Sequence, residues 1–254
     1  MNVEYHEWNS IRLDAKAQIK VYGYWGFPLL VFPCAGGSFF EFEDFGMVET
    51  IREFIEAGKL KVFTVQSWDS KSWLNNSISF SERARNHEIY VDYITSEVVP
   101  FIHSHMGGKQ GITAFGCSLG AMHSLSFALR FPEIFTSVIA LSGIYRLSRL
   151  VGDYKDELTV RSSPIDFLES LIEGPLIQKI RENSLTICCG QGAWENESLE
   201  DTLALPPLFE KRAIPAWIDL WGKDVSHDWP WWRKQLPYFI QKCVEKNNKR
   251  NMSH

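Results

Sequence analysis

The chain has 254 residues, of which 45% are hydrophobic and 22% are charged, and its formal net charge is −5. This composition supplies a large apolar core and excludes a disordered or fibrous protein. No run of Lys and Arg is longer than two residues, which excludes the basic surface typical of nucleic-acid-binding proteins, so we expect a small-molecule ligand.

The N-terminal segment and the cysteines bear on the cellular compartment. The first twenty residues mix charges throughout, and nowhere do about 18 apolar residues follow one another, so neither a secretory leader nor a membrane span is expected. The five cysteines lie mostly in apolar runs, which is typical of buried, reduced thiols. We therefore expect a cytoplasmic protein. The sequence leaves homo-oligomerisation open.

Short apolar runs alternate with longer segments of helical periodicity along the chain. Strands are predicted, in chain order, at Ile19 to Tyr24, Leu29 to Phe32, Lys61 to Val65, Gly111 to Phe115, Ser137 to Leu141, Leu185 to Cys189 and Ala216 to Trp221. Helices are predicted at Phe45 to Ala57, His87 to His105, Leu119 to Arg130, Pro175 to Asn183 and Trp231 to Glu245.

The pattern of these elements predicts the fold class. The later strands are apolar along their whole length, as in VIALS and LTICC, which is typical of parallel strands covered by helices on both faces. No repeat or linker divides the chain, so we expect one α/β domain over residues 1–254 with a doubly wound, mostly parallel sheet. Residues 143–183 are expected to form a small cap-like excursion over the C-terminal edge of the strands, and residues 246–254 a flexible tail.

A Gly-x-Ser-x-Gly pentapeptide, Gly116-Cys117-Ser118-Leu119-Gly120, stands between a predicted strand and a predicted helix. In that context it is typical of a nucleophile elbow, a strained turn that exposes its serine at the sheet edge and uses glycines where side chains would collide. The alternative is a glycine-rich turn with a surface serine. We predict that Ser118, and not Cys117, is a catalytic nucleophile.

A serine hydroxyl needs an imidazole as general base, and the elbow requires the chain order Ser, acid, His. Of the seven histidines, His6 and His254 are terminal, and His123 lies in the elbow helix, facing away from the sheet edge. Three more, His87, His103 and His105, precede Ser118. His227 lies in a polar loop after the last predicted strand. By elimination His227 is the predicted base.

The acid is expected in the loop that follows the strand Leu185 to Cys189, which reads GQGAWENE. Glu195 is preferred because it comes soon after the glycine turn. Glu197 and Asp201 lie further into a helical segment, and Asp228 is adjacent to the histidine that it would have to orient, so these three are less favoured.

The oxyanion of a tetrahedral intermediate needs two backbone N–H donors. The elbow supplies the amide of Leu119. The second donor is expected in the loop Pro33-Cys34-Ala35-Gly36-Gly37-Ser38, whose small residues let the backbone approach a substrate. We place it at Ala35, with Cys34 and Gly36 as alternatives.

These residues resemble a known family. The elbow, the segment Ser142-Gly143-Ile144-Tyr145 and the segment Ser226-His227-Asp228-Trp229 are similar to those of the α/β-hydrolase superfamily, in the Putative esterase family that includes S-formylglutathione hydrolases and the antigen 85 mycolyltransferases. The resemblance covers roughly Pro28 to Val244. It implies an α/β-hydrolase fold and a Ser-His-acid hydrolase of esters or thioesters that uses no metal and no cofactor, with Ser118, His227 and Glu195 as the triad.

Ester or thioester hydrolysis through an acyl-enzyme is therefore the favoured function. An acyltransferase that uses the same acyl-enzyme is an alternative, because sequence does not reveal whether the pocket admits water. A catalytically silent binding or adhesion protein is another alternative, although its mark would be a broken triad. No nucleic-acid partner is expected.

The aromatic residues suggest a pocket and its support. Trp68, Trp73 and Tyr145 follow strands whose loops belong at the same sheet edge, and we hypothesise that they line an acyl or alcohol pocket, the alternative being that they cover the core beside it. Six of the ten tryptophans lie between Trp194 and Trp232, the segment that supplies the predicted acid and base. They are interpreted as apolar support for those two loops.

Overall fold

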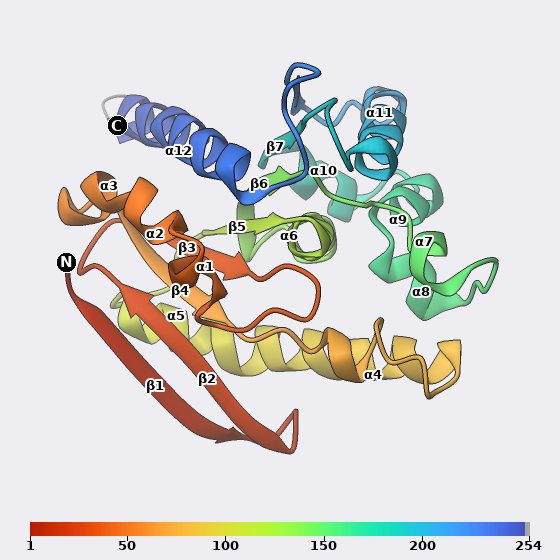
Figure 1. Cartoon of the computed structure of the whole chain (residues 1–254), viewed down its shortest axis with the longest axis horizontal. Helices are drawn as coiled ribbons and strands as arrows, with labels where there is room; N and C mark the ends of the chain where they lie inside the picture. Colours follow the sequence, from red (N-terminus) through yellow and green to blue (C-terminus); the bar gives the residue numbers. More distant parts are fainter. Residues whose placement is uncertain (252–254) are drawn as a thin grey trace.

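A computed structural model describes the backbone of residues 1–251 and the side chains up to residue 245. One eight-stranded sheet, in the order β1-β2-β4-β3-β5-β6-β7-β8, runs through the centre of the molecule (Figure 1). Its strands are β1 (Val3–Ser10), β2 (Ala15–Tyr22), β3 (Phe27–Phe32), β4 (Leu60–Val65), β5 (Ile112–Cys117), β6 (Phe135–Leu141), β7 (Ser184–Cys189) and β8 (Ala216–Leu220).

Six of the strands are parallel to one another, and the first two form an antiparallel hairpin at one edge. β4, β5 and most of β6 and β7 are buried along their length, because helices cover both faces of the sheet. The predicted fold class is thereby confirmed. The edge strand β1 was not predicted, because its residues alternate between exposed and half-buried and form no apolar run.

One face of the sheet is covered by helices from the two ends of the chain, seen at the upper left of Figure 1. They are α1 (Glu41–Asp44), α2 (Met47–Thr50), α3 (Arg52–Glu56) and α12 (Trp229–Asn251). The prediction of a single helix over 45–57 was wrong, because Ile51, at φ −115°, interrupts it between α2 and α3. The adjacent β-branched residues Thr50 and Ile51 lower the helix propensity at this point.

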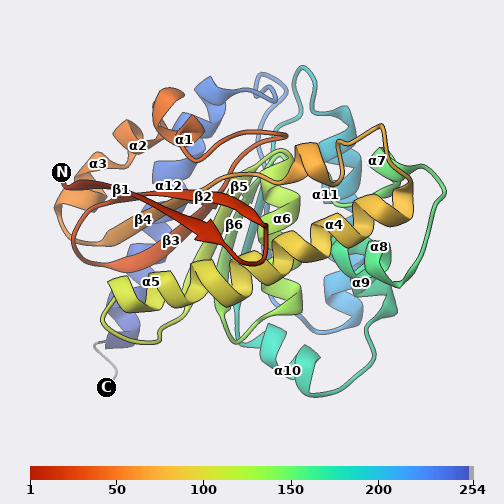
Figure 2. The same cartoon turned by 90° about the horizontal axis from the view of Figure 1, so that it is seen from below.

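The opposite face carries the longer middle helices, of which α4 and α5 lie in front in Figure 2. They are α4 (Phe80–Tyr93), the π-helical turn η2 (Ile94–Val98), α5 (Val99–His105), α6 (Leu119–Arg130), α9 (Pro164–Ser170), α10 (Pro175–Arg181) and α11 (Asn196–Lys211). Helix α4 begins seven residues before the predicted start at His87, at a capping box that Ser79 and Glu82 form.

The segment 143–183 leaves the sheet after β6 and returns to it at β7. Besides α9 and α10 it contains α7 (Ser148–Val151) and α8 (Glu157–Ser162), which stand at the right of Figure 1. Of the tail expected over 246–254, residues 246–251 continue α12 and the last three lie outside the described residues. Within the described part of the chain, every helix is too short or too polar to span a bilayer.

Candidate active site

The turn between β5 and α6 holds Ser118 at φ 56° and ψ −124°, a strained conformation for a residue with a side chain. Both flanking glycines are required by space. A Cβ on Gly116 would lie 2.2 Å from the carbonyl of Gly120, and a Cβ on Gly120 would lie 2.4 Å from the carbonyl oxygen of Phe32. The turn therefore has the geometry of a nucleophile elbow and presents Ser118 at the carboxyl end of β5.

Ser118, His227 and Glu195 lie in one chain of hydrogen bonds. Ser118 Oγ is 3.0 Å from His227 Nε2, and His227 Nδ1 is 3.2 Å from Glu195 Oε2. A carboxylate only accepts hydrogen bonds, so its contact places the proton on Nδ1 and leaves the lone pair of Nε2 toward the serine. The three residues follow β5, β7 and β8, whose parallel arrangement brings their carboxyl ends to the same sheet edge.

The loops that carry Glu195 and His227 are joined by backbone hydrogen bonds. The amide of Gly192 donates to the carbonyl of Val225 at 2.8 Å, and the amide of His227 donates to the carbonyl of Ala193 at 3.0 Å. A Cβ on Gly190 would lie 2.2 Å from the same Val225 oxygen, so this close approach requires glycine. These contacts fix the position of the loop that carries the imidazole relative to the loop that carries the carboxylate.

The Glu195 side chain is only 1% exposed and accepts from several donors besides the histidine. The Ser142 hydroxyl donates at 2.6 Å, the Gly190 amide at 3.3 Å and the Cys189 thiol at 3.4 Å. Ser142 Oγ in turn accepts from the indole Nε1 of Trp232 at 3.0 Å. These donors fix the orientation of the carboxylate. Sequence reasoning missed the role of Ser142, whose only signal is a polar residue directly after an apolar strand.

Replacing Ser142 by Ala is expected to lower the free energy of unfolding by about 1–3 kcal/mol, since it leaves the buried Trp232 N–H without its acceptor and removes a donor to Glu195. Urea unfolding measures this change. Ser137→Ala is the matched control, because that β6 hydroxyl makes a single part-buried bond to a backbone carbonyl at 3.3 Å. Equal stability of the Ser142 variant and the wild type would contradict the prediction.

Aromatic rings surround the histidine loop on one side. The Trp232 ring stands edge-on to His227 with centroids 5.0 Å apart, Trp229 packs edge-on against Trp232, and Phe45 stacks on Trp229 at 4.3 Å. Trp194 differs from these, since it is 78% exposed and adopts φ 63°. The expected apolar support is thus present beside His227, whereas Trp194 lies at the surface beside Glu195.

Leu119 and Ala35, the predicted oxyanion donors, both line one cavity with Ser118 and His227. Among the described residues, neither of their amides has a hydrogen-bond acceptor. The amides of the two alternatives, Cys34 and Gly36, each donate to a carboxylate. Ala35, unlike its two neighbours, therefore lines the same cavity as Ser118 and has an amide with no acceptor among the described residues.

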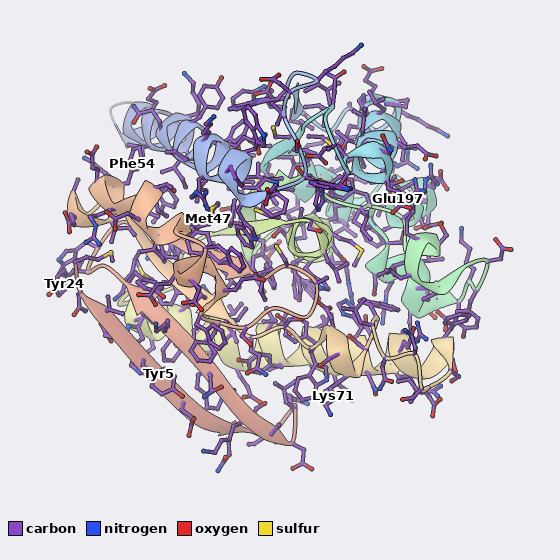
Figure 3. All side chains as sticks on the ribbon, viewed as in Figure 1. Tyr5, Tyr24, Met47, Phe54, Lys71 and Glu197 are labelled. Atoms are coloured by element: carbon purple, nitrogen blue, oxygen red, sulfur yellow. The ribbon has the colours of Figure 1, made fainter. Side chains whose placement is uncertain are left out.

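The cavity has a volume of about 410 Å³. Its walls are largely apolar, with polar groups where α11 begins. One of these polar residues, Glu197, is labelled in Figure 3, on the opposite side of the molecule from Tyr5 of the β1-β2 hairpin. Beyond the serine, the histidine and the two amide-bearing residues, the lining consists of Leu74, Ile144, Leu150, Trp194, Asn196, Glu197 and Ser198.

Trp68, Trp73 and Tyr145 were expected to line the pocket. None of them is among the described residues that line this cavity, so that expectation was wrong. Trp73 is 1% exposed and packs on the ring of His87, Tyr145 is fully buried, and Trp68 is partly buried against the hydrophobic core. The large rings are buried in the core, which gains most from their apolar area. The aliphatic neighbours of two of them, Leu74 and Ile144, line the cavity instead.

All five cysteines are free thiols, as expected. Cys117, next to the serine, is 3% exposed, and burial raises the pKa of its thiol well above the usual value. Burial also raises the pKa of Cys34. Because the thiolate is the reactive form, neither is a suitable nucleophile.

Within the described residues, one group with metal-ligand chemistry comes together, formed by Glu4 and His6 of β1 and His105 of α5. The ammonium of Lys61 lies 3.3 Å from His105 Nδ1 and places a positive charge beside the group. Three strands separate β1 from β5 in the sheet, so this cluster takes no part in the site around Ser118.

Comparison with known proteins agrees with this geometry. The family model described as "Putative esterase" matches residues 41–243. A ferulic acid esterase structure superposes with a TM-score of 0.73 at 14% identity, covering 96% of this chain and 98% of that one. S-formylglutathione hydrolase from Staphylococcus aureus gives 0.71 at 15% identity, with coverages of 96% and 97%. The fluorophosphonate-binding serine hydrolase F of the same organism gives 0.68 at 17% identity, with coverages of 96% and 98%. No curated protein matches by sequence.

At these identities the superpositions establish the fold, while the family model, which spans most of the chain, establishes the family. Both agree with the resemblance read from the elbow and from the histidine segment. The chain therefore belongs to the Putative esterase family of the α/β-hydrolase fold and is an enzyme of the carboxylic ester hydrolase class.

Proposed function

We propose that the chain cleaves carboxylic esters or thioesters through an acyl-enzyme on Ser118, with His227 as general base and Glu195 as the acid that orients it. The observation that carries this proposal is the continuous hydrogen-bonded path from Ser118 Oγ through both ring nitrogens of His227 to the buried Glu195 carboxylate. Such a path lets the imidazole take the hydroxyl proton as the serine attacks.

The first half of the reaction takes place in the cavity that Ser118 lines. Ser118 Oγ forms a bond to the substrate carbonyl carbon while its proton passes to His227 Nε2. The carbonyl oxygen becomes an oxyanion that the amides of Leu119 and Ala35 hold, and Leu119 is the first residue of α6, where the helix dipole also favours negative charge. Collapse of the intermediate returns the proton to the departing alcohol or thiol.

The second half of the reaction releases the acyl group. His227 deprotonates a water molecule, which attacks the ester carbonyl of the acyl-serine, and the proton then returns to Ser118 Oγ. The apolar walls formed by Leu74, Ile144 and Leu150 favour an apolar acyl or alcohol group of modest size.

An active-site fluorophosphonate tests the proposal directly. We expect one covalent adduct on the folded protein, localised to Ser118 by peptide mapping, and none after heat unfolding. Hydrolysis of a chain-length series of p-nitrophenyl esters then reports the acyl preference, and added alcohols reveal any transfer to an acceptor other than water. A folded protein that forms no adduct at Ser118 would overturn the proposal.

A further inference from the structure

Two carboxylates hold the loop 33–38 from opposite sides of Ala35. Glu41, at the start of α1, accepts the amide of Cys34 at 2.8 Å, and Asp69 accepts the amide of Gly36 at 3.4 Å. Asp69 begins the short 3-10 turn η1 (Asp69–Lys71) after β4. The amides of both neighbours of Ala35 are thus engaged, whereas the amide of Ala35, which lines the cavity, has no acceptor among the described residues.

Asp69 is buried, so its carboxylate needs hydrogen-bond partners within the protein. It is 1% exposed, its Oδ2 accepts from the Ser67 hydroxyl at 2.6 Å, and its Oδ1 lies 2.9 Å from His123 Nε2. Burial alone would raise the pKa of this carboxyl, but the charge of His123 and the hydrogen bonds from His123, Ser67 and Gly36 outweigh burial and lower it. Asp69 is therefore held as a carboxylate, with His123 as its partner.

His123 ties this pair to the nucleophile. It lies in α6, five residues after Ser118, and is 2% exposed. The ring of His87 on α4 stacks on it with centroids 5.3 Å apart and planes at 20°, and Tyr90 packs edge-on at 6.0 Å. Burial lowers the pKa of His87 well below its usual value, and the charges of His123 and Arg130 act in the same direction. His87 thus packs on His123 as a neutral ring.

We propose that Glu41, Asp69 and His123 form an oxyanion-loop clamp, a set of positioning residues that fixes the Ala35 amide relative to Ser118. The clamp links the loop to α6, the helix that begins at Leu119 directly after the serine, so both oxyanion donors are tied to the same helix. The contact of His123 Nε2 with Asp69 Oδ1 at 2.9 Å is the bond that joins the loop's carboxylate to α6. This inference rests on the proposed function, in which the Ala35 amide is the second donor.

The clamp predicts a defect confined to the transition state. Asp69→Ala is expected to lower kcat for p-nitrophenyl acetate by about 10²–10³-fold, the loss typical of one oxyanion donor, with KM within about threefold of wild type. Asp69→Asn keeps an oxygen that can accept the Gly36 amide and should lose less. His123→Gln removes the imidazole that contacts the buried Asp69 carboxylate and should lower kcat more than the double variant Asp69→Asn/His123→Gln does.

Two measurements distinguish positioning of the oxyanion donor from a general loss of stability in these variants. First, kcat is normalised to the serines titrated by the fluorophosphonate, which removes any contribution from unfolded protein. Second, a trifluoromethyl ketone, whose adduct with a serine carries an oxyanion, should lose affinity in proportion to kcat/KM. Asp201→Asn is the matched control, because Asp201 is also fully buried and accepts two backbone amides, those of Tyr145 and Arg146. Its kcat per titrated site should stay within about threefold of wild type.

The outcomes separate the two proposals. If the wild type forms no adduct at Ser118, the proposed function itself fails. If the wild type is labelled and active but kcat per titrated site in Asp69→Ala and His123→Gln stays within threefold, the clamp alone is overturned. If Asp69→Ala does not fold, the clamp is tested by comparing kcat of His123→Gln with kcat of the double variant. If the double variant loses as much kcat as His123→Gln, or the sum of the two single losses, the role of His123 is overturned.

Discussion

Replacing His227 by Ala is expected to lower kcat for ester hydrolysis by about 10⁴–10⁶-fold, as in serine hydrolases that lose the general base. The imidazole is the group that lies 3.0 Å from Ser118 Oγ, and no proton acceptor replaces it in the variant. The ring is about one-fifth exposed, so its removal opens no sealed cavity and the Tm should change little. Steady-state kinetics and thermal unfolding on the same preparation measure both effects.

A matched histidine controls for the loss of an imidazole elsewhere. His103 lies in α5, half-buried, and contacts the carbonyl of Gln110 at 3.2 Å. His103→Ala should leave kcat within about twofold of wild type. Activity of the His227 variant within tenfold of wild type would show that another group removes the serine proton.

Replacing Glu195 by Gln is expected to lower kcat by about 10³–10⁴-fold, because the amide cannot hold the imidazole in the required tautomer. The carboxylate accepts from His227, Ser142, Gly190 and Cys189, and a glutamine would turn an N–H₂ group toward some of these donors. KM should change much less than kcat, since none of these contacts involves substrate. Initial-rate kinetics on p-nitrophenyl acetate measure the split.

The same experiment distinguishes Glu195 from the acids near it. Glu197 is exposed at the start of α11. The Asp228 carboxylate accepts a hydrogen bond from the amide of Trp229 at 2.7 Å instead of contacting the imidazole. Glu197→Gln and Asp228→Asn should each retain kcat within about fivefold. A larger loss in either of them than in Glu195→Gln would move the acid assignment to that residue.

Much of the fold was predictable because its signals are local. Buried parallel strands are continuous apolar runs, and β5, β6 and β7 were predicted to within a residue or two for this reason. The edge strand β1 and the broken helix over 45–57 were missed, because the pairing of an edge strand and the interruption at Ile51 depend on neighbours that lie far along the chain.

The predicted site residues also came from local context. The elbow pentapeptide could be identified because its two glycines are sterically required by the turn. The chain order of the elbow then led to the prediction of the acid and the base in the loops after β7 and β8. The pocket was different. Trp73 and Tyr145 are in the right loops, yet their side chains turn into the core while Leu74 and Ile144 line the cavity. A shift of one position along a loop is decided by packing, which no local pattern encodes.

The sequence by itself determined the fold class and the strand-turn-helix context of Ser118, because buried parallel strands and the elbow pentapeptide are local patterns. It also led to the prediction of a serine, an acid and a histidine in that chain order. Only the tertiary structure decided what surrounds them. Ser142 and Trp232 support Glu195 from 53 residues upstream of it and from the first turns of α12, and Asp69 meets His123 across 54 residues. The tryptophans near the acid and the base likewise acquired a role only where Trp232 contacts His227 and Ser142. Such contacts arise when the sheet brings distant loops to one edge, where burial makes each polar group find a partner.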